Sequence, residues 1–378
     1  MKILHILTDT NIGGAGICVL SLIDWAQSAN AGIKIHVVLP EGSDLMPEMG
    51  RRRIKVFEAP FLSEESFDRR AVVPLIKIVR REKPDIVHTH AALSGRLAGR
   101  ICGAKVVATR HSVFDIGRKQ TRFPFNVASK AANSLLADAF IAVSPAAAEN
   151  LKLLGAPQQK IRVIFNGVAP SPFLAQEDRD YLRRSYGFNR EDFIVSIMAR
   201  LVDVKGHDTI LDAARMIKNL DSSIRFLIAG EGPARRHLEE RVEGEGLSNV
   251  TFTGFVKEIY LIENITDLQI NASYGTEATS MALLSGMSLG IPAIASDYGG
   301  NPYVIEDGAN GIIFQMKNGP ALTKAILDIK SNPDLYSMMS AKAMEIYSKR
   351  FTLDAMGSST LELYREVLQK PERAKKYS

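Results

Sequence analysis

Residues 277–302, EATSMALLSGMSLGIPAIASDYGGNP, contain one complete example of the pattern that decides the fold. An acidic residue precedes an apolar run of helical length, Leu-Gly-Ile-Pro ends that run, and a short Ala/Ile-rich segment leads to a Gly-Gly-Asn-Pro turn. The Ala/Ile-rich segment has no polar alternation, which is typical of a strand buried on both faces of a parallel sheet. This stretch therefore predicts a helix followed by a buried parallel strand, the repeating element of an α/β fold.

The same alternation of strand-like and helix-length segments continues in both directions along the chain. In the first half we expect strands at 2–7, 34–39, 54–59, 85–90, 105–111, 139–144 and 161–168, with helices at 15–30, 70–83, 93–102 and 145–154. In the second half we expect strands at 193–201, 225–233, 250–256, 268–274 and 292–300. Two consecutive arrays of this kind predict two doubly wound domains, with ligands beyond the carboxyl ends of the strands and between the domains.

The expected domain boundary lies in residues 169–192, which interrupt the alternation with prolines and clustered charges. We interpret this segment as a connector with one short helix. The sequence therefore predicts domains at 1–170 and 171–352, followed by a helical stretch within 353–378.

Length and composition indicate a globular protein. The chain has 378 residues, of which 46% are hydrophobic and 24% charged, and this length suits two domains better than one core. Cys18 and Cys102 lie far apart in the sequence and predict no disulfide framework, as in a reducing compartment. No apolar run approaches the length of about 20 residues that spans a membrane, and no signal peptide is evident. We therefore expect a cytoplasmic protein.

Charge is unevenly distributed along the chain. Residues 1–165 carry 23 Lys and Arg against 14 Asp and Glu, whereas the rest carries 24 against 28, and the basic excess concentrates between 51 and 122. This pattern fits a solvated surface or an anionic partner, such as the inner face of the cell membrane or a lipid-phosphate acceptor. Nucleic acid is disfavoured, because no stacking aromatics are interleaved with the cations.

The segment ARLVDVKGHDTILDAA (199–214) places two cations just beyond a buried strand. Arg200 and Lys205 lie five residues apart, and a glycine follows the lysine. An Arg fork and a Lys point charge suit a diphosphate that becomes more negative as its bond to a sugar breaks. Two surface cations beside a turn would give the same pattern.

A glycine-rich segment, NIGGAG (11–16), follows the first expected strand. Gly13 and Gly14 would let the backbone approach a phosphate at the N-terminus of the next helix. The segment lacks the full dinucleotide-binding fingerprint, and an ordinary strand-to-helix turn also explains it.

Glu277 is the first residue of the stretch 277–302, directly before the helix that Thr279 or Ser280 would cap. A carboxylate at this place can accept hydrogen bonds from sugar hydroxyls, or it can be a first-turn acid that the helix dipole favours. Gly299 and Gly300 would let the following loop pass close to the same ligand.

In order and spacing these motifs resemble the family 4 retaining glycosyltransferases of the GT-B fold, along essentially the whole chain. The resemblance rests on GG (13–14), HTH (88–90), the TRH that ends at His111, the segment 199–214, AGEGP (229–233), TGFV (253–256), the segment 273–302, GANGIIF (308–314) and RFTLDAM (350–356). It implies an N-terminal domain that holds the acceptor, a C-terminal domain that holds a nucleotide diphospho-sugar, and a final helix that returns to the first domain.

The resemblance also implies roles for individual residues. Arg200 and Lys205 would bind the diphosphate near Gly13 and Gly14, Glu277 would bind hydroxyls of the donor sugar, and His111 would lie close to the transferred sugar. Further donor contacts would come from Gly230, Val256, Ala278, Thr279, Ser280, Met281 and Ser285. The implied reaction retains the anomeric configuration and needs no metal ion or cofactor besides the donor.

Three positions depart from the family pattern. The family usually has a second glutamate eight residues after the first, which binds the ribose, and this chain has Ser285 there. Tyr303 stands where glutamate is common, and Ala278 where glycine is common. Serine is a neutral and shorter partner, so these changes concern donor affinity and the choice of nucleotide.

Other candidate metal ligands are weak. His88 and His90 alternate on one strand without an evident third ligand, and Asp178-Arg-Asp lies in the connector. Asp115 and the segment 118–125, with cations beside two phenylalanines, are candidates for acceptor or membrane contact.

We therefore expect a retaining, metal-independent transferase that moves a hexose or N-acetylhexosamine, most simply from a UDP-sugar. The expected acceptor is a glycan or a lipid-linked saccharide in cell-surface polysaccharide biosynthesis. Two other functions fit the same sequence: a catalytically silent relative that binds a glycan or another transferase, and a sugar-nucleotide hydrolase or 2-epimerase. The latter would consume the donor without an acceptor.

Overall fold

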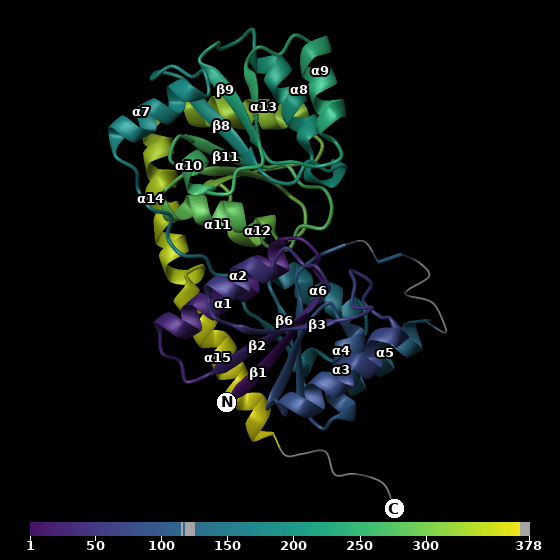
Figure 1. Ribbon diagram of the computed structural model, residues 1–378. Coiled ribbons are helices and arrows are strands. Elements are labelled where there is room, and N and C mark those ends of the chain that lie inside the picture. Colours follow the sequence, from purple (N-terminus) through teal and green to yellow (C-terminus); the bar gives the residue numbers. More distant parts are fainter. Residues whose placement is uncertain (115, 118–124, 371–378) are drawn as a thin grey trace, which may run out of the picture. The chain divides into compact units, whose positions relative to one another are not determined.

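The computed structural model describes residues 1–114, 116–117 and 125–370 (Figure 1). Its contacts divide the chain into two compact units, one formed by Met1–Gly167 and Leu353–Ser378 and the other by Val168–Thr352. Each unit contains one parallel sheet with its own hydrophobic core.

The first unit contains a seven-stranded sheet with the order β3-β2-β1-β4-β5-β6-β7, in which every pairing is parallel. The strands are β1 (Lys2–Leu7), β2 (Lys34–Pro40), β3 (Lys55–Ala59), β4 (Ile86–His90), β5 (Lys105–Arg110), β6 (Ala139–Ala142) and β7 (Ile161–Val163). All seven expected strands are confirmed. The edge strand β7 ends at Val163, earlier than the sequence predicts, and β5 ends one residue before His111.

Helices cover both faces of this sheet because its strands are apolar on both sides. Ile3 and Leu7 of β1 belong to the core beneath α1 (Gly14–Ser28) and α15 (Leu353–Gln369). Leu4 and Ile6 belong to the core beneath α3 (Arg69–Glu82) and α4 (Leu93–Ile101). The remaining helices of the unit are α2 (Met46–Arg51), α5 (Phe125–Leu136), α6 (Pro145–Leu153) and the 3-10 turn Gln158–Lys160.

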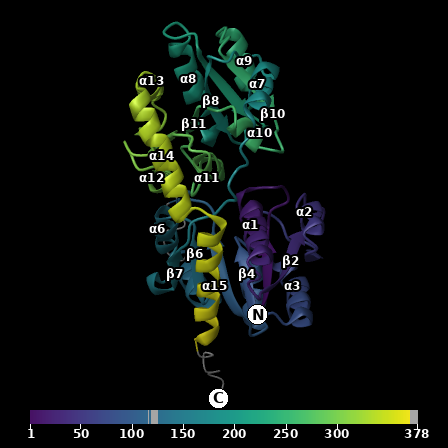
Figure 2. The ribbon, with the colours of Figure 1, turned by 90° about the vertical axis from the view of Figure 1, so that its left-hand side faces the viewer.

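The final helix, α15, packs on the first unit, as the sequence leads us to expect (Figure 2). Its Tyr364 is completely buried in the core that α1 shares, and Trp25 of α1 donates a hydrogen bond from Nε1 to Asp354 Oδ1 over 3.0 Å. The chain thus leaves the first unit after Gly167 and returns to it at Leu353.

The second unit contains a six-stranded parallel sheet with the order β10-β9-β8-β11-β12-β13. The strands are β8 (Phe193–Met198), β9 (Ile224–Ala229), β10 (Val250–Gly254), β11 (Leu268–Asn271), β12 (Ala293–Ser296) and β13 (Gly311–Phe314). Five of them are expected from the sequence. The sequence analysis does not predict β13.

The helices of the second unit follow the expected alternation (Figure 1). They are α7 (Gln176–Ser185), α8 (His207–Ile217), α9 (Arg235–Gly244), α10 (Tyr260–Glu263), α11 (Met281–Ser288), α12 (Asn301–Val304), α13 (Gly319–Lys330) and α14 (Pro333–Arg350), with the 3-10 turn Asp203–Lys205 before α8. The expected short helix of the connector is α7.

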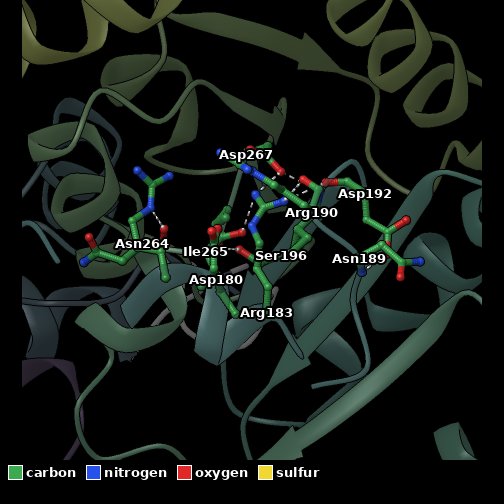
Figure 3. A network of polar contacts seen from close by, with 12 residues as sticks. Asp180, Arg183, Asn189, Arg190, Asp192, Ser196, Asn264, Ile265 and Asp267 are labelled. Carbon is green, nitrogen blue, oxygen red and sulfur yellow. Dashed lines mark hydrogen bonds and ion pairs between the residues drawn. The ribbon is translucent and has the colours of Figure 1, made fainter. Parts of the chain in front are cut away.

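A buried arginine fixes α7 to the sheet (Figure 3). The Arg183 guanidinium donates to the carbonyl oxygens of Arg190, Asp192 and Ile265, and to Asp267 Oδ2 over 2.8 Å. Asp267 Oδ2 also accepts from Ile194 N at the start of β8. Burial raises the pKa of Asp267, and the positive charge of Arg183 opposes that shift. Arg183, one member of the charge cluster that marks the connector in the sequence, therefore has a structural role.

Two sequence expectations concern the chain as a whole. Cys18 and Cys102 are free thiols. Over the ranges that the structure describes, every helix is too short or too polar to cross a bilayer.

Candidate functional site

Each sheet has a position where the strand order reverses, between β1 and β4 in the first unit and between β8 and β11 in the second. Open parallel sheets bind ligands beyond the carboxyl ends of the strands at such a position. Lys205 follows β8 and Glu277 follows β11, so both come from the strands that flank the reversal in the second sheet.

Lys205 and Glu277 form an ion pair at this position. Lys205 Nζ lies 2.7 Å from Glu277 Oε2, which also accepts hydrogen bonds from Asn271 Nδ2 and Ser273 Oγ, each over 3.1 Å. The carboxylate is buried, whereas 23% of the lysine side chain is exposed. All three bonds use Oε2, and Oε1 has no partner among the described residues. This carboxylate is thus fixed in orientation with one oxygen available for a ligand.

Arg200 lies on the loop after β8, where its side chain is exposed and forms no ion pair within the described part of the chain. Gly230, after β9, supports this loop. Its φ of +152° suits glycine, and a Cβ there would lie 2.0 Å from the carbonyl oxygen of Ala199. Gly230 therefore has a packing role that explains the glycine without a ligand, and its predicted donor contact stays a prediction.

The two adjacent glycines that end the stretch 277–302 pack against its beginning. A Cβ on Gly299 would lie 2.1 Å from the carbonyl oxygen of Glu277, and a Cβ on Gly300 would lie 1.6 Å from that of Ala278. Gly300 N donates to the Glu277 carbonyl over 3.2 Å. The loop after β12 therefore holds the backbone of the glutamate in place, a role that the sequence does not reveal.

The helix after Glu277 begins as expected. Ser280 is the N-cap of α11, with its hydroxyl accepting from Leu283 N, and Thr279 instead donates to its neighbour's carbonyl oxygen. Ala278 is buried, and Met281 begins the helix half-buried. Val256, beyond β10, packs against the core that contains Phe188. The donor contacts predicted for these residues stay predictions.

Ser285 is engaged with protein groups. Its hydroxyl lies 2.9 Å from Ser171 Oγ, which donates to Glu263 Oε2, and Ser171 N donates to Ser288 Oγ over 2.9 Å. Burial raises the pKa of Glu263, while its bonds from Ser171 and Ser285 oppose that shift. At the position where the family has a ribose-binding glutamate, this chain has a serine that fastens the connector to α11.

Histidines occupy the corresponding position of the first sheet. His5 of β1 pairs in register with His88 of β4, and His90 lies two residues further along β4. Nδ1 of His5 lies 3.0 Å from His90 Nε2, and Nδ1 of His90 lies 2.7 Å from His111 Nε2, just beyond β5. His88 instead lies 2.6 Å from both Tyr364 Oη and Thr109 Oγ1. Sequence reasoning missed His5, because only the strand register brings it to the others.

His5, His88 and His90 are buried and His111 is half-buried, so their surroundings disfavour the charged form of each ring. Burial lowers the pKa of His5 to about 3 and that of His111 to about 4, and it holds the pKa values of His88 and His90 well below the ordinary value. The three nearest ring nitrogens of His5, His88 and His90 lie within 4.8 Å of one another, so a third imidazole does join the HTH pair. Two of these nitrogens already face each other in a hydrogen bond.

The glycine segment after β1 is the N-terminus of α1, with Gly13 as the N-cap. A Cβ on Gly14 would meet nothing within 4 Å, and one on Gly13 would make ordinary contacts. Packing within the described residues therefore does not require either glycine. Asp9 Oδ2 accepts from Gly16 N over 3.2 Å, and burial raises the pKa of Asp9. Asp9 thus contacts the N-terminus of α1, a contact that the sequence analysis does not predict.

Two further sequence candidates, Asp178 and Asp180, lie apart from both sites. Asp178 and Asp180 lie in α7, where Asp180 accepts a hydrogen bond from Gln176. Asp115 and most of the segment 118–125 lie outside the described residues.

Comparison with known proteins places this arrangement in a class. The fold resembles that of Anabaena HepE, solved in complex with UDP, with a TM-score of 0.83 at 21% identity over 97% of this chain and 100% of that chain. Two Rossmann-like parallel sheets of this kind define the GT-B glycosyltransferase fold.

Sequence comparison identifies the family. Residues 12–171 match Glycosyltransferase Family 4, and residues 178–346 match Glycosyl transferases group 1. The chain is 30% identical to the putative glycosyltransferase EpsD of Bacillus subtilis over 69% of this chain and 71% of EpsD. It is 24% identical to the UDP-Gal:alpha-D-GlcNAc-diphosphoundecaprenol alpha-1,3-galactosyltransferase of Escherichia coli over 86% and 87% of the two chains. The chain belongs to glycosyltransferase family 4.

Proposed function

We propose that this glycosyltransferase moves a hexose or N-acetylhexosamine from a UDP-sugar to a saccharide or lipid-linked acceptor, with retention of configuration. The observation that supports this proposal best is the Lys205–Glu277 pair at the strand reversal of the second sheet. The relatives agree with this proposal, since HepE was solved with UDP and the Escherichia coli relative is named for a UDP-galactose donor and a diphosphoundecaprenol acceptor. Such an enzyme would serve cell-surface polysaccharide biosynthesis.

In the proposed reaction the acceptor oxygen bonds to the anomeric carbon while the bond from that carbon to the diphosphate breaks. The acceptor proton passes to an oxygen of the departing diphosphate, on the same face of the sugar. Lys205 and Arg200 supply positive charge for this leaving group, so the proposal needs no metal ion. Glu277 Oε1 accepts from a hydroxyl of the donor sugar, while Asn271 and Ser273 hold the carboxylate through Oε2.

The contacts expected for the nucleotide differ from the family pattern more than the other expected contacts of the donor do. Ser285 would offer the ribose a neutral hydroxyl that Ser171 and Glu263 already share. Gly13, Gly14 and His111 belong to the first unit, and their contacts with a donor stay a prediction.

A donor-hydrolysis screen over UDP-, GDP- and ADP-sugars tests the proposed function. We expect the protein to hydrolyse one or more UDP-sugars slowly and to transfer the sugar faster when a saccharide acceptor is present. Glu277→Gln keeps the size of the side chain and its contacts with Asn271 and Ser273, but removes the charge that a sugar hydroxyl would contact. We expect that variant to lose about 100-fold in kcat/KM, as for a charge-assisted hydrogen bond in a buried site.

The same screen separates the other two functions. If the protein binds UDP but consumes none of the sugar nucleotides, the catalytically silent function is favoured. Consumption of the donor that added acceptors leave unchanged would favour a hydrolase or epimerase. Equal rates for Glu277→Gln and the parent would contradict the role of Glu277.

We also propose that the exposed face of α3 contacts an anionic membrane. Its cations Arg69, Lys77, Arg80 and Arg81 are exposed, and Val73 lies among them with 58% of its surface exposed. Cations around an exposed apolar residue suit the headgroup region of a bilayer. This face accounts for part of the basic excess in the sequence.

Sedimentation with vesicles tests this contact. We expect the parent to bind vesicles that contain phosphatidylglycerol at low salt, and a Lys77→Glu, Arg80→Glu variant to lose at least about 30-fold in affinity, at about 1 kcal/mol for each cation removed. Arg236→Glu, on the exposed side of α9, serves as the matched control. Equal binding of all three proteins would contradict the proposal.

A further inference from the structure

Two arginines of the first unit carry their charge without a carboxylate partner. Arg96 lies in α4, which follows β4, and Arg110 is the last residue of β5. Neither forms an ion pair within the part of the chain that the structure describes. Arg100, one turn later in α4, does have such a partner, since its Nη2 lies 3.1 Å from Asp138 Oδ1. Neither the proposed reaction nor the proposed membrane contact uses Arg96 or Arg110.

Strand register brings the two arginines to the same face of the sheet. Arg110 pairs with Ala142 of β6, and Ala108 pairs with Phe140, two residues earlier in each strand. Alternate residues of a strand point to the same face, and so do residues paired in register in a parallel sheet, so Arg110 and Phe140 share one face. The Arg96 guanidinium lies over the Phe140 ring, 5.4 Å from its centroid. Arg96 and Arg110 therefore lie on one face, beyond the ends of neighbouring strands.

Each guanidinium makes one hydrogen bond within the described residues, to the oxygen of an asparagine amide. Arg96 Nη1 donates to Asn133 Oδ1 over 3.0 Å. Arg110 Nη2 donates to Asn150 Oδ1. Both amides are held in this orientation, because each also donates from Nδ2 to a backbone carbonyl oxygen. An amide oxygen accepts an N–H but carries no charge, so the two positive charges stay uncompensated.

Both guanidinium groups keep donors without acceptors. The Nε–H of Arg96 and that of Arg110 are enclosed and have no partner among the described residues. Arg110 lies over the Phe114 ring, 4.0 Å from its centroid, as Arg96 lies over Phe140, so packing holds both planar groups in place. Both arginines are half-buried, which leaves part of each open to a ligand. Planar groups held in this way suit the paired oxygens of a carboxylate or a phosphate.

The surroundings make the two charges unfavourable unless an anion is bound. Burial, with a smaller contribution from the charge of Arg110, lowers the pKa of Arg96 to about 10. Burial also lowers the pKa of Arg110 to about 10, so both groups remain charged at neutral pH. Uncompensated charges in a partly buried place are costly, and an anion in contact with both arginines would offset that cost.

We propose that Arg96 and Arg110 together bind one oxyanion, a phosphate group, beyond the carboxyl ends of β4 and β5. A phosphate monoester carries between one and two negative charges at neutral pH, which matches two arginines better than the single charge of a carboxylate. Its oxygens can accept paired hydrogen bonds from a guanidinium. We assign this phosphate to the acceptor, and that assignment alone rests on the proposed function.

The response of the first unit to inorganic phosphate tests the site without a donor or an acceptor. Urea unfolding of the full chain is followed by the fluorescence of Trp25, which is buried in α1, in sodium phosphate and in sodium chloride of equal ionic strength. A ligand of the folded state stabilises it by an amount that its concentration and dissociation constant determine. We expect phosphate to stabilise the parent. Arg96→Gln and Arg110→Gln should each bind phosphate about tenfold more weakly, because each loses charge-assisted hydrogen bonds.

Arg225→Gln is the matched control. Arg225 is also half-buried over a phenylalanine ring, and its Nη2 donates to a backbone carbonyl oxygen, but it belongs to β9 of the second unit. This variant should respond to phosphate like the parent. If a glutamine variant fails to fold, lysine at the same position keeps the charge without the fork and should still bind phosphate more weakly than the parent.

Two results would overturn the inference. The first is an equal phosphate response in the parent and in the Arg96→Gln, Arg110→Gln double variant. The second concerns Asp115, which follows Arg110 by five positions in the sequence and lies outside the described residues. A phosphate response that appears only in Asp115→Asn would mean that a carboxylate of the chain itself neutralises the two arginines.

Transfer kinetics decide to which molecule the phosphate belongs. We expect a saccharide 1-phosphate to have a KM about tenfold lower than the same saccharide without phosphate, and this difference to disappear in Arg96→Gln. If the unfolding response depends on both arginines but the two acceptors have equal KM values, the site binds free phosphate and its assignment to the acceptor is wrong. If the protein transfers no sugar, the proposed function fails, and the unfolding experiment still decides whether the site exists.

Discussion

Replacing Lys205 with methionine is expected to weaken UDP binding by about 100-fold or more. The variant removes a cation that a diphosphate needs, and it leaves the buried Glu277 carboxylate without its ion-pair partner at 2.7 Å. Removing one partner of a charged contact between a protein and its ligand, here the expected contact of Lys205 with the diphosphate, costs about 2–5 kcal/mol, and each 1.4 kcal/mol is a factor of about ten in affinity. Isothermal titration of UDP into the parent and the variant measures the difference.

Two further variants show which charge determines the affinity for UDP. Lys205→Met combined with Glu277→Gln removes both charges, and we expect it to recover part of the lost affinity because no uncompensated carboxylate remains near the diphosphate. Lys324→Met, on the exposed side of α13, is the control for a surface lysine and should bind UDP like the parent. Unchanged affinity in Lys205→Met would remove the central support for a diphosphate at this place.

The first unit is expected to unfold on mild acidification, before the second. In the folded state burial lowers the pKa of His5 to about 3 and that of His111 to about 4, with His88 and His90 also well below 6.5. The unfolded chain binds these protons near pH 6.5, so it takes up more protons than the folded state as the pH falls. The stability is therefore complete above about pH 6.5 and decreases as the pH falls towards the folded-state values.

The expected loss is large compared with the stability of a domain. A histidine whose folded-state pKa lies near 3 or 4 costs about 1.4 kcal/mol per pH unit below 6.5, so His5 and His111 together give about 4 kcal/mol at pH 5. The lowered pKa values of His36, His88 and His90 act in the same direction. Typical domains have only about 5–15 kcal/mol in total. In the second unit His207 contributes one such loss, because burial lowers its pKa to about 4. The raised pKa values of Glu263 and Asp267 act in the opposite direction there, since their folded forms bind protons more readily.

A single tryptophan makes the two units separable in experiment. Trp25 is the one tryptophan of the sequence and is buried in α1 of the first unit. Its fluorescence during urea unfolding between pH 5 and pH 7.5 should therefore report the loss of the first unit, while far-UV circular dichroism reports both. His5→Gln should reduce the pH dependence, because it removes one buried imidazole, and His237→Gln should leave it unchanged. A stability that is constant from pH 7.5 to 5 would contradict the neutral, buried cluster.

Local patterns in the sequence predict most of the fold because they are properties of short segments. Apolar runs without alternation mark twelve of the strands that the structure contains, and the connector with its short helix lies where prolines and charges interrupt the rhythm. Ser280 caps α11 as its residue type and position indicate. Among the strands of the described residues, β13 (Gly311–Phe314) is the one that this reasoning does not predict.

The residues of the candidate site are predicted less completely, because a sequence gives their places along the chain and not their partners. Lys205 and Glu277 are expected on motif grounds, but Asn271 and Ser273 emerge as partners of Glu277 only in the structure. Ser285 is expected to face a ribose, and the structure shows its hydroxyl bound to Ser171, 114 positions earlier. Such contacts depend on which loops the fold brings together.

The sequence alone determines two parallel α/β sheets and the position of the cations and the carboxylate just past strand ends, because hydrophobic period and strand length are local. The tertiary structure alone decides which strands become neighbours, and so which side chains meet. His5 and His90 lie 85 positions apart and come into contact because β1 pairs with β4. Gly300 must be a glycine because the loop after β12 crosses the backbone of Ala278. Both facts follow from strand order and register, which residue patterns within a single segment do not contain.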